Sequence, residues 1–197
     1  MTGQACSCGV SEKPLEIMRP GGLVLTEEAL AACGLAPPAR VLDAGCGTGA
    51  VVSRLRELGY RAAGVDLAAR GPHCMAGRIE HLPAKTSAFD CVLCECVLSI
   101  AADPHACLRE MHRVLIPSGI AVISDVYDRS DPDALAGLLG SCGFSVTLWQ
   151  DHTRSLQEFA AAALLQGRSA LPGLPQFISP RKAGYCLILA RKDSPHG

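Results

Sequence analysis

The chain has 197 residues, about the length of one domain, and 49% of them are hydrophobic, which is enough for a sizeable core. Eighteen basic residues balance nineteen acidic ones without a Lys/Arg run, which argues against a nucleic-acid or anionic-membrane partner. No apolar stretch approaches the ~18 residues of a membrane span, and the N-terminus does not resemble a signal peptide, so we expect a cytoplasmic protein.

The cysteine content is high, with 11 cysteines in the chain. The number is odd, and most of them stand inside apolar runs. In a chain without an export signal this pattern is typical of reduced thiols, so we do not expect a disulfide framework.

The first part of the chain predicts an irregular arm followed by a short helix. Residues 1–25 contain two prolines and a glycine pair. Thr26 can cap a helix whose first turn is acidic, and that helix is expected to end near 33–34.

The next segment predicts a parallel pair of strands. Residues 40–44 and 61–66 are expected as strands that flank a helix over 51–58. A third strand over 73–76 follows Pro72, which favours an edge position. Only about six residues separate it from the strand before, so we expect a single-turn helix there unless this strand is misplaced.

Strands and helices continue to alternate in the second half of the chain. Strands are expected at 89–96, 120–125, 144–150 and 184–190, and helices at 104–115, 132–143 and 155–166. Ser155 and Glu158 form a candidate capping box for the last helix. The pattern predicts one domain with an open, mostly parallel sheet and helices on both faces. The final strand is expected to return as the antiparallel partner of the strand before it.

A glycine-rich loop connects the first strand to its helix. Glycines alternate at Gly45, Gly47 and Gly49, which permits a tight turn, close approach of a ligand to the backbone, and free N–H groups for an anion. Asp66 ends the second strand about 20 residues later, where it can accept both ribose hydroxyls of a nucleotide. NAD and S-adenosylmethionine share this requirement.

Asp43 distinguishes between these two ligands. It stands one residue before the first strand ends, where a carboxylate suits the ammonium of a methionine tail. The same carboxylate is unfavourable beside a pyrophosphate, and the chain is short for a separate substrate domain. S-adenosylmethionine is therefore the favoured ligand.

Several motifs in order resemble the class I S-adenosylmethionine-dependent methyltransferases, in particular the small-molecule group that includes quinone-biosynthesis and arsenite methyltransferases. They are VLDAGCGTG at 41–49, GVD at 64–66, GRIEHLP at 77–83, SAFDCVLCECVLSI at 87–100 and DPHACLREMHRVLIPSG at 103–119. The resemblance implies a Rossmann-like seven-stranded sheet with a C-terminal antiparallel hairpin. It also implies methyl transfer to a small-molecule acceptor, with neither nucleic acid nor membrane as partner.

The resemblance also implies a division of labour along the chain. Residues 40–127 would form the cofactor-binding core and 128–197 the acceptor-side half. The cofactor would be held by Asp43, Gly45, Cys46, Gly47, Gly49, Asp66, Ile79, Glu80, Glu95 and Cys96. Apart from the resemblance, the apolar residues and the glycine pair of residues 18–25 predict a lid over the cofactor, with Arg19 on its carboxylate; the alternative is an arm packed on the outer flank of the sheet.

Few residues are candidates for the reaction itself. Glu95, at the end of the fourth strand, is the best candidate for orienting the substrate or taking a proton. The alternative is that Glu95 has no part in the reaction and only contacts the cofactor or caps a helix. Asp125 and Tyr127 end the fifth strand on the same rim and could touch the substrate. His112 lies mid-helix and is expected to be a packed surface residue.

Cys91, Cys94 and Cys96 have a spacing that invites a metal interpretation. On a strand, Cys91 would point to the opposite face from the other two, so the three could not converge. We expect no metal site and interpret these residues as small core residues. A thiol-reactive substrate at Cys96 is an alternative, because arsenite methyltransferases use thiols.

Two other functions remain open from the sequence. One is an NAD(P)-dependent oxidoreductase, which the glycine pattern also permits. The other is a cofactor-binding module without catalysis, since no strong base is evident.

Overall fold

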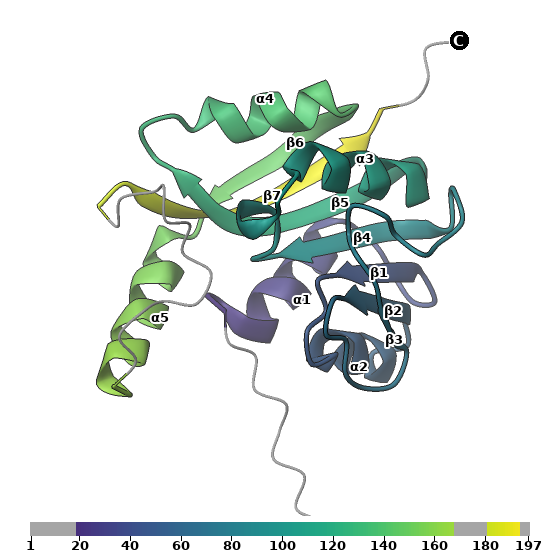
Figure 1. Ribbon diagram of the computed structural model, residues 1–197, viewed down its shortest axis with the longest axis horizontal. Coiled ribbons are helices and arrows are strands. Elements are labelled where there is room, and N and C mark those ends of the chain that lie inside the picture. The colour runs from purple at the N-terminus through teal and green to yellow at the C-terminus, as the bar shows by residue number, and fades with distance from the viewer. Residues whose placement is uncertain (1–18, 168–180, 194–197) are drawn as a thin grey trace, which may run out of the picture.

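The computed structural model describes residues 19–167 and 181–193 and contains one seven-stranded sheet (Figure 1). The strands are β1 (Arg40–Ala44), β2 (Arg61–Asp66), β3 (Cys74–Ala76), β4 (Phe89–Glu95), β5 (Leu115–Asp128), β6 (Phe144–Asp151) and β7 (Ala183–Lys192). The helices are α1 (Gly22–Ala32), α2 (Ala50–Glu57), α3 (Pro104–Val114), α4 (Asp133–Ser141) and α5 (Thr153–Leu165), with a short 3-10 helix η1 (Leu98–Ile100).

The strand order is β3-β2-β1-β4-β5-β7-β6. The first five strands pair in parallel, and β7 runs antiparallel between β5 and β6. The predicted fold class, including the C-terminal hairpin, is confirmed. The carboxyl ends of β1, β2, β4 and β5 meet at one edge of the sheet, which is where ligands bind in open α/β folds.

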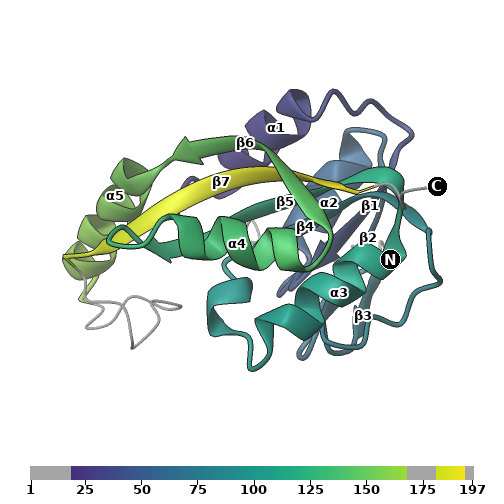
Figure 2. The ribbon, with the colours of Figure 1, turned by 90° about the horizontal axis from the view of Figure 1, so that it is seen from above.

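Helices cover both faces of the sheet, and Figure 2 shows α1 and α3 on opposite sides. One apolar cluster joins α3 and α4 to the sheet through residues such as Leu108, Met111 and Leu139. The other joins α1, α2 and α5 and includes Leu25 and Leu55. The two faces therefore have separate cores.

The start of α1 differs from the prediction. The helix begins at Gly22, and Gly21 precedes it with a φ of 76°. Thr26 lies inside the helix, is buried, and donates its hydroxyl to the carboxylate of Glu95 at 3.1 Å. Its oxygen therefore has a partner far along the chain instead of a helix N–H. The predicted end is confirmed, because Cys33 caps the helix.

Three further local predictions need correction. The connection from β2 to the edge strand β3 contains turns instead of a single-turn helix. The strand predicted from 120 begins at Leu115, which pairs with Phe89 across a bulge. The capping box at Ser155 is wrong, because α5 begins at Thr153, where the Asp151 carboxylate accepts the backbone N–H at 2.7 Å.

No helix in the described ranges is long and apolar enough to cross a membrane.

Candidate functional site

A pocket of about 300 Å³ lies at the carboxyl ends of β1 and β4. It is lined by six of the residues predicted from the sequence, namely Asp43, Gly45, Cys46, Gly47, Glu95 and Cys96. Arg19, just before α1, also lines the pocket. The first turn of α2 closes the floor.

Two glycines of the loop meet different requirements. Gly47 has a φ of 50°, and a Cβ placed on it would enter open space, with no atom within 4 Å. A Cβ on Gly45 would lie 2.2 Å from Cγ2 of Val97. Gly45 therefore allows the loop to pack on the segment after β4, and Gly47, which lines the pocket, leaves the space beside its own backbone empty.

The other predicted cofactor residues lie outside the pocket lining. Asp66 accepts the N–H groups of Gly47 at 3.0 Å and Ala68 at 2.9 Å, so its carboxylate holds the glycine loop. Gly49 faces the segment before β3, because a Cβ there would lie 2.8 Å from the carbonyl oxygen of Arg70.

Ile79 and Glu80 follow β3. Ile79 is buried in the core cluster beneath α3, and Glu80 pairs with Arg78 at 3.2 Å. Their predicted contact with the cofactor stays a prediction.

The pocket holds two buried side-chain atoms of ionisable groups that have no hydrogen-bond partner among the described residues. One is Oδ2 of Asp43, and the other is Nη1 of Arg19. Burial raises the pKa of Asp43 to about 8; the nearby carboxylates of Glu95 and Asp66 add to the effect, and Arg19 opposes it. A ligand with one cationic and one anionic group would satisfy both atoms, so the residues fit the amino-acid end of S-adenosylmethionine.

Glu95 faces α1. Its carboxylate lies 2.9 Å from Nη2 of Arg19 and accepts the hydroxyls of Thr26 at 3.1 Å and Ser124 at 3.5 Å. Burial raises its pKa, and the Arg19 charge opposes that rise. Glu95 therefore anchors the segment that carries Arg19, while its catalytic role remains a prediction.

We expect Glu95→Gln to lower the free energy of unfolding by about 3 kcal/mol, because the buried Arg19 guanidinium loses its charged partner. Glu27→Gln is the matched control: Glu27 pairs with Arg54 in a half-exposed position, so its loss should cost less than about 1 kcal/mol. Urea denaturation measures both values. If the two variants have the same free energy of unfolding and only Glu95→Gln loses turnover, Glu95 has a role in the reaction instead.

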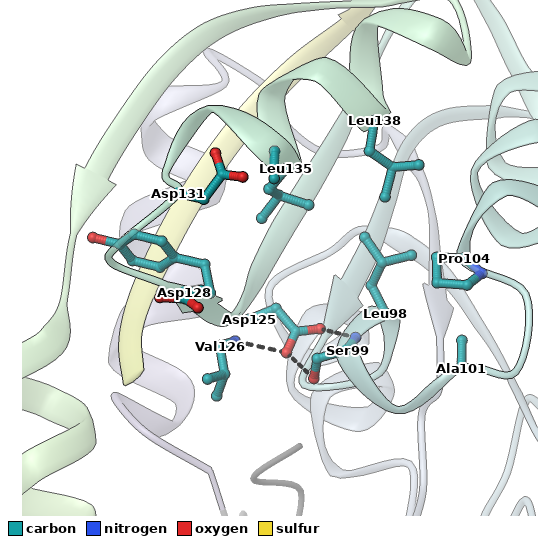
Figure 3. Close-up of a pocket in the computed structure, with 12 residues that line it drawn as sticks. Leu98, Ser99, Ala101, Pro104, Asp125, Val126, Asp128, Asp131, Leu135 and Leu138 are labelled. Carbon is teal, nitrogen blue, oxygen red and sulfur yellow. Dashed lines mark hydrogen bonds between the residues drawn. The ribbon is translucent and has the colours of Figure 1, made fainter. Parts of the chain in front are cut away.

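A second pocket, of about 390 Å³, lies between η1, the end of β5 and the start of α4 (Figure 3). Asp125 and Tyr127, both predicted to lie on the reactive rim, are among its lining residues. Ser99 also lines it and was not predicted. Its position, four residues after Glu95 and beyond the end of the fourth strand, was the available signal.

His112 is a packing residue, as predicted. Its ring lies edge-on to Phe144 with 5.4 Å between the ring centroids. Burial, and then the charge of Lys192, lower its pKa.

The cysteines lie on both faces of the sheet. Cys91 and Cys94 pack in opposite clusters, as predicted. The placement of Cys96 with Cys94 was wrong: β4 ends at Glu95, and Cys96 has a left-handed φ of 58° that turns its side chain toward the Cys91 side. All nine cysteines within the described ranges are free thiols, and no group of three metal-ligating side chains converges there.

Comparisons with known proteins agree with this geometry. Residues 42–123 match the family described as a methyltransferase domain. An uncharacterised methyltransferase of Bacillus subtilis (strain 168) is 36% identical over 117 residues, which cover 52% of this chain and 50% of that protein. An arsenite methyltransferase of Aquipseudomonas alcaligenes is 32% identical over 153 residues, covering 60% of this chain and 44% of that protein. The chain thus spans half or less of the length of these two relatives.

A solved structure extends the likeness to the whole fold. Geranyl diphosphate C-methyltransferase from Streptomyces coelicolor, in complex with Mg²⁺, geranyl diphosphate and S-adenosylhomocysteine, superimposes with a TM-score of 0.67. It is 19% identical in sequence, and the match covers 86% of this chain and 79% of that one. The fold is therefore that of the Rossmann-like methyltransferases. The match of residues 42–123 to the methyltransferase domain family agrees with the resemblance seen in the sequence.

Proposed function

We propose that the protein transfers a methyl group from S-adenosylmethionine to a small-molecule acceptor. One observation carries the proposal: the pocket beside the glycine loop presents an unpartnered buried carboxylate oxygen and an unpartnered buried guanidinium nitrogen among the described residues. A free amino-acid terminus has the complementary pair of charges. A dinucleotide pyrophosphate has two negative charges and would be repelled by Asp43.

Each wall of the pocket has a role in this proposal. Asp43 binds the ammonium of the cofactor, and Arg19 binds its carboxylate. Gly47 lets the cofactor lie against the loop backbone, and Asp66 holds that loop while keeping lone pairs for the ribose hydroxyls. The bound cofactor supplies an electrophilic methyl group, and the protein contributes alignment and exclusion of water.

The segment predicted as a lid or an arm combines features of both: Arg19 reaches the pocket, whereas Leu25 is buried in the core cluster on one face of the sheet. Met18 lies outside the described residues, but Arg19 reaches the pocket and is fastened there by Glu95. We therefore extend the proposal to the division of the chain, with 40–127 binding the cofactor and 128–197 shaping the acceptor side. Cytoplasmic location stays a prediction.

Calorimetry with four ligands tests the function. We expect S-adenosylmethionine and S-adenosylhomocysteine to bind, and NAD and NADP to show no measurable heat of binding. Tight NAD binding without adenosylmethionine binding would instead establish the oxidoreductase alternative. Binding of adenosylmethionine, without methyl transfer to any acceptor offered, would favour the non-catalytic module.

The affinity for S-adenosylhomocysteine should rise with pH. The raised pKa of Asp43, about 8, means that the free protein holds a neutral carboxyl at pH 6, whereas the ligand ammonium requires the carboxylate. Each pH unit below 8 therefore costs up to about tenfold in affinity, and calorimetry at pH 6 and 7 should show this factor. Over the same range the stability of the free protein should fall as pH rises, because its folded state binds the extra proton. Asp43→Asn should remove both slopes, and unchanged slopes in that variant would assign them to another group.

A further inference from the structure

The second pocket has largely apolar walls. Leu135 and Leu138 reach from α4 toward Leu98 of η1, and Pro104 and Ala101 close the far side (Figure 3). Its volume of about 390 Å³ is within the range of small-molecule sites. These walls would bury the hydrocarbon body of a compact ligand.

A polar pair lies at one end of this pocket. Asp125 is 1% exposed, and it accepts the hydroxyl of Ser99 at 2.5 Å and the backbone N–H of Ser99 at 3.0 Å. Ser99 has donated its only hydroxyl hydrogen, so its oxygen keeps lone pairs that can accept a hydrogen bond from a ligand. The pair is therefore an acceptor site held in place by its own hydrogen bonds.

The charged residues that line the pocket are all acidic among those the structure describes. Asp128 and Asp131 stand with Asp125 in the lining, and no lysine or arginine joins them there. A ligand with a carboxylate or phosphate would face like charges and find no cation to pair with. The pocket therefore selects against anionic molecules.

The two pockets adjoin along the chain. Glu95 and Cys96 line the first, Leu98 and Ser99 line the second, and Val97 separates them. The side chain of Val97 lies against Gly45 of the glycine loop. A ligand in the second pocket thus lies beside the segment that borders the cofactor pocket.

We propose that the second pocket is the methyl-acceptor site, an inference that rests on the proposed function. It takes a compact, largely apolar molecule whose nucleophile carries an N–H or O–H group and which has no anionic group. Ser99 and Asp125 receive the donor, and the leucines of η1 and α4 enclose the apolar body.

Three probes with one body and different head groups test this inference: phenylpropylamine, phenylpropanol and phenylpropionate. Ligand-observed NMR titrations with the full chain, saturated with S-adenosylhomocysteine, measure their affinities. We expect the amine and the alcohol to bind and the carboxylate to bind at least about tenfold more weakly. The ratio of the first two affinities distinguishes an amine site from a hydroxyl site.

Variants locate the binding. Leu135→Trp should fill the pocket and lower the affinities for the amine and the alcohol at least about tenfold. Leu164→Trp, at a position 69% exposed on α5, is the matched control and should leave both affinities unchanged. Ser99→Ala should lower the affinity for the alcohol. It should not change the affinity for propylbenzene, which has the same apolar body and no hydrogen-bond donor.

Three outcomes would overturn the inference: equal affinity for the carboxylate, no effect of Leu135→Trp, or no binding of any probe by a protein that binds S-adenosylhomocysteine. The last result would leave the proposed function standing. A chain that does not bind S-adenosylhomocysteine would instead refute the proposed function, and the acceptor role with it, whatever the probes do.

Discussion

Gly47→Val should abolish binding of S-adenosylmethionine, with a loss of more than about a thousandfold in calorimetry. Gly47 lines the pocket and a Cβ on it would meet no protein atom within 4 Å, so we expect the larger valine side chain to occupy volume next to the backbone that the cofactor needs. The left-handed φ of 50° adds a strain of about 1–2 kcal/mol to the folded protein.

Gly34→Val separates these two effects. Gly34 has a φ of 67° and is exposed, and a Cβ there would also have no atom within 4 Å, but the residue lies after α1 and away from the pocket. It should lose a similar amount of stability and keep the affinity of the unmodified chain. If both variants lose affinity equally, backbone strain explains the result and the loop does not contact the cofactor.

Asp43→Asn should change binding and stability in opposite directions. Affinity for S-adenosylmethionine should fall about a hundredfold, because the ammonium loses a charged acceptor inside a buried site. The free protein should become more stable, by about 2 kcal/mol, because the substitution removes a buried carboxyl whose raised pKa reflects the cost of ionising it. Calorimetry and thermal unfolding of the ligand-free chain measure the two effects.

Asp90→Asn is the matched control for this substitution. Asp90 lies at the opposite end of β4 and pairs with Arg40 at 2.8 Å, so it should leave the affinity unchanged and slightly lower the stability. A variant of Asp43 that loses both stability and affinity would contradict the proposed role, because it would mean that the carboxylate has a structural partner.

Strands were predictable where a compact apolar run carries an acidic residue at or next to its carboxyl end. β1, β2 and β4 follow this rule, and their parallel order places Asp43 and Glu95 at one edge of the sheet. The glycine loop was predictable for the same reason, since its glycines follow a buried strand directly. Six of the ten predicted cofactor residues therefore line one pocket.

The errors have a common physical origin. The sequence identifies a residue that can form a hydrogen bond, but it does not identify the partner. Thr26 was expected to cap a helix and instead binds Glu95, and Ser155 was expected to cap α5, where the Asp151 carboxylate accepts the N–H of Thr153 instead. Cys96 was misplaced because strand alternation stops where φ becomes positive. Ser99 was not predicted because its role depends on Asp125, which the fold brings within hydrogen-bond distance.

The position of β7 has a consequence for how the chain folds. This last strand inserts between β5 and β6, and β6 pairs with no other strand among the described residues. During synthesis, one edge of β5 therefore stays unpaired until residues 183–192 have been made. An open edge strand of this kind recruits other chains and leads to aggregation. Insertion of β7 is thus the step that protects a nascent chain, and substitutions that slow it should reduce the yield of folded protein more than its final stability.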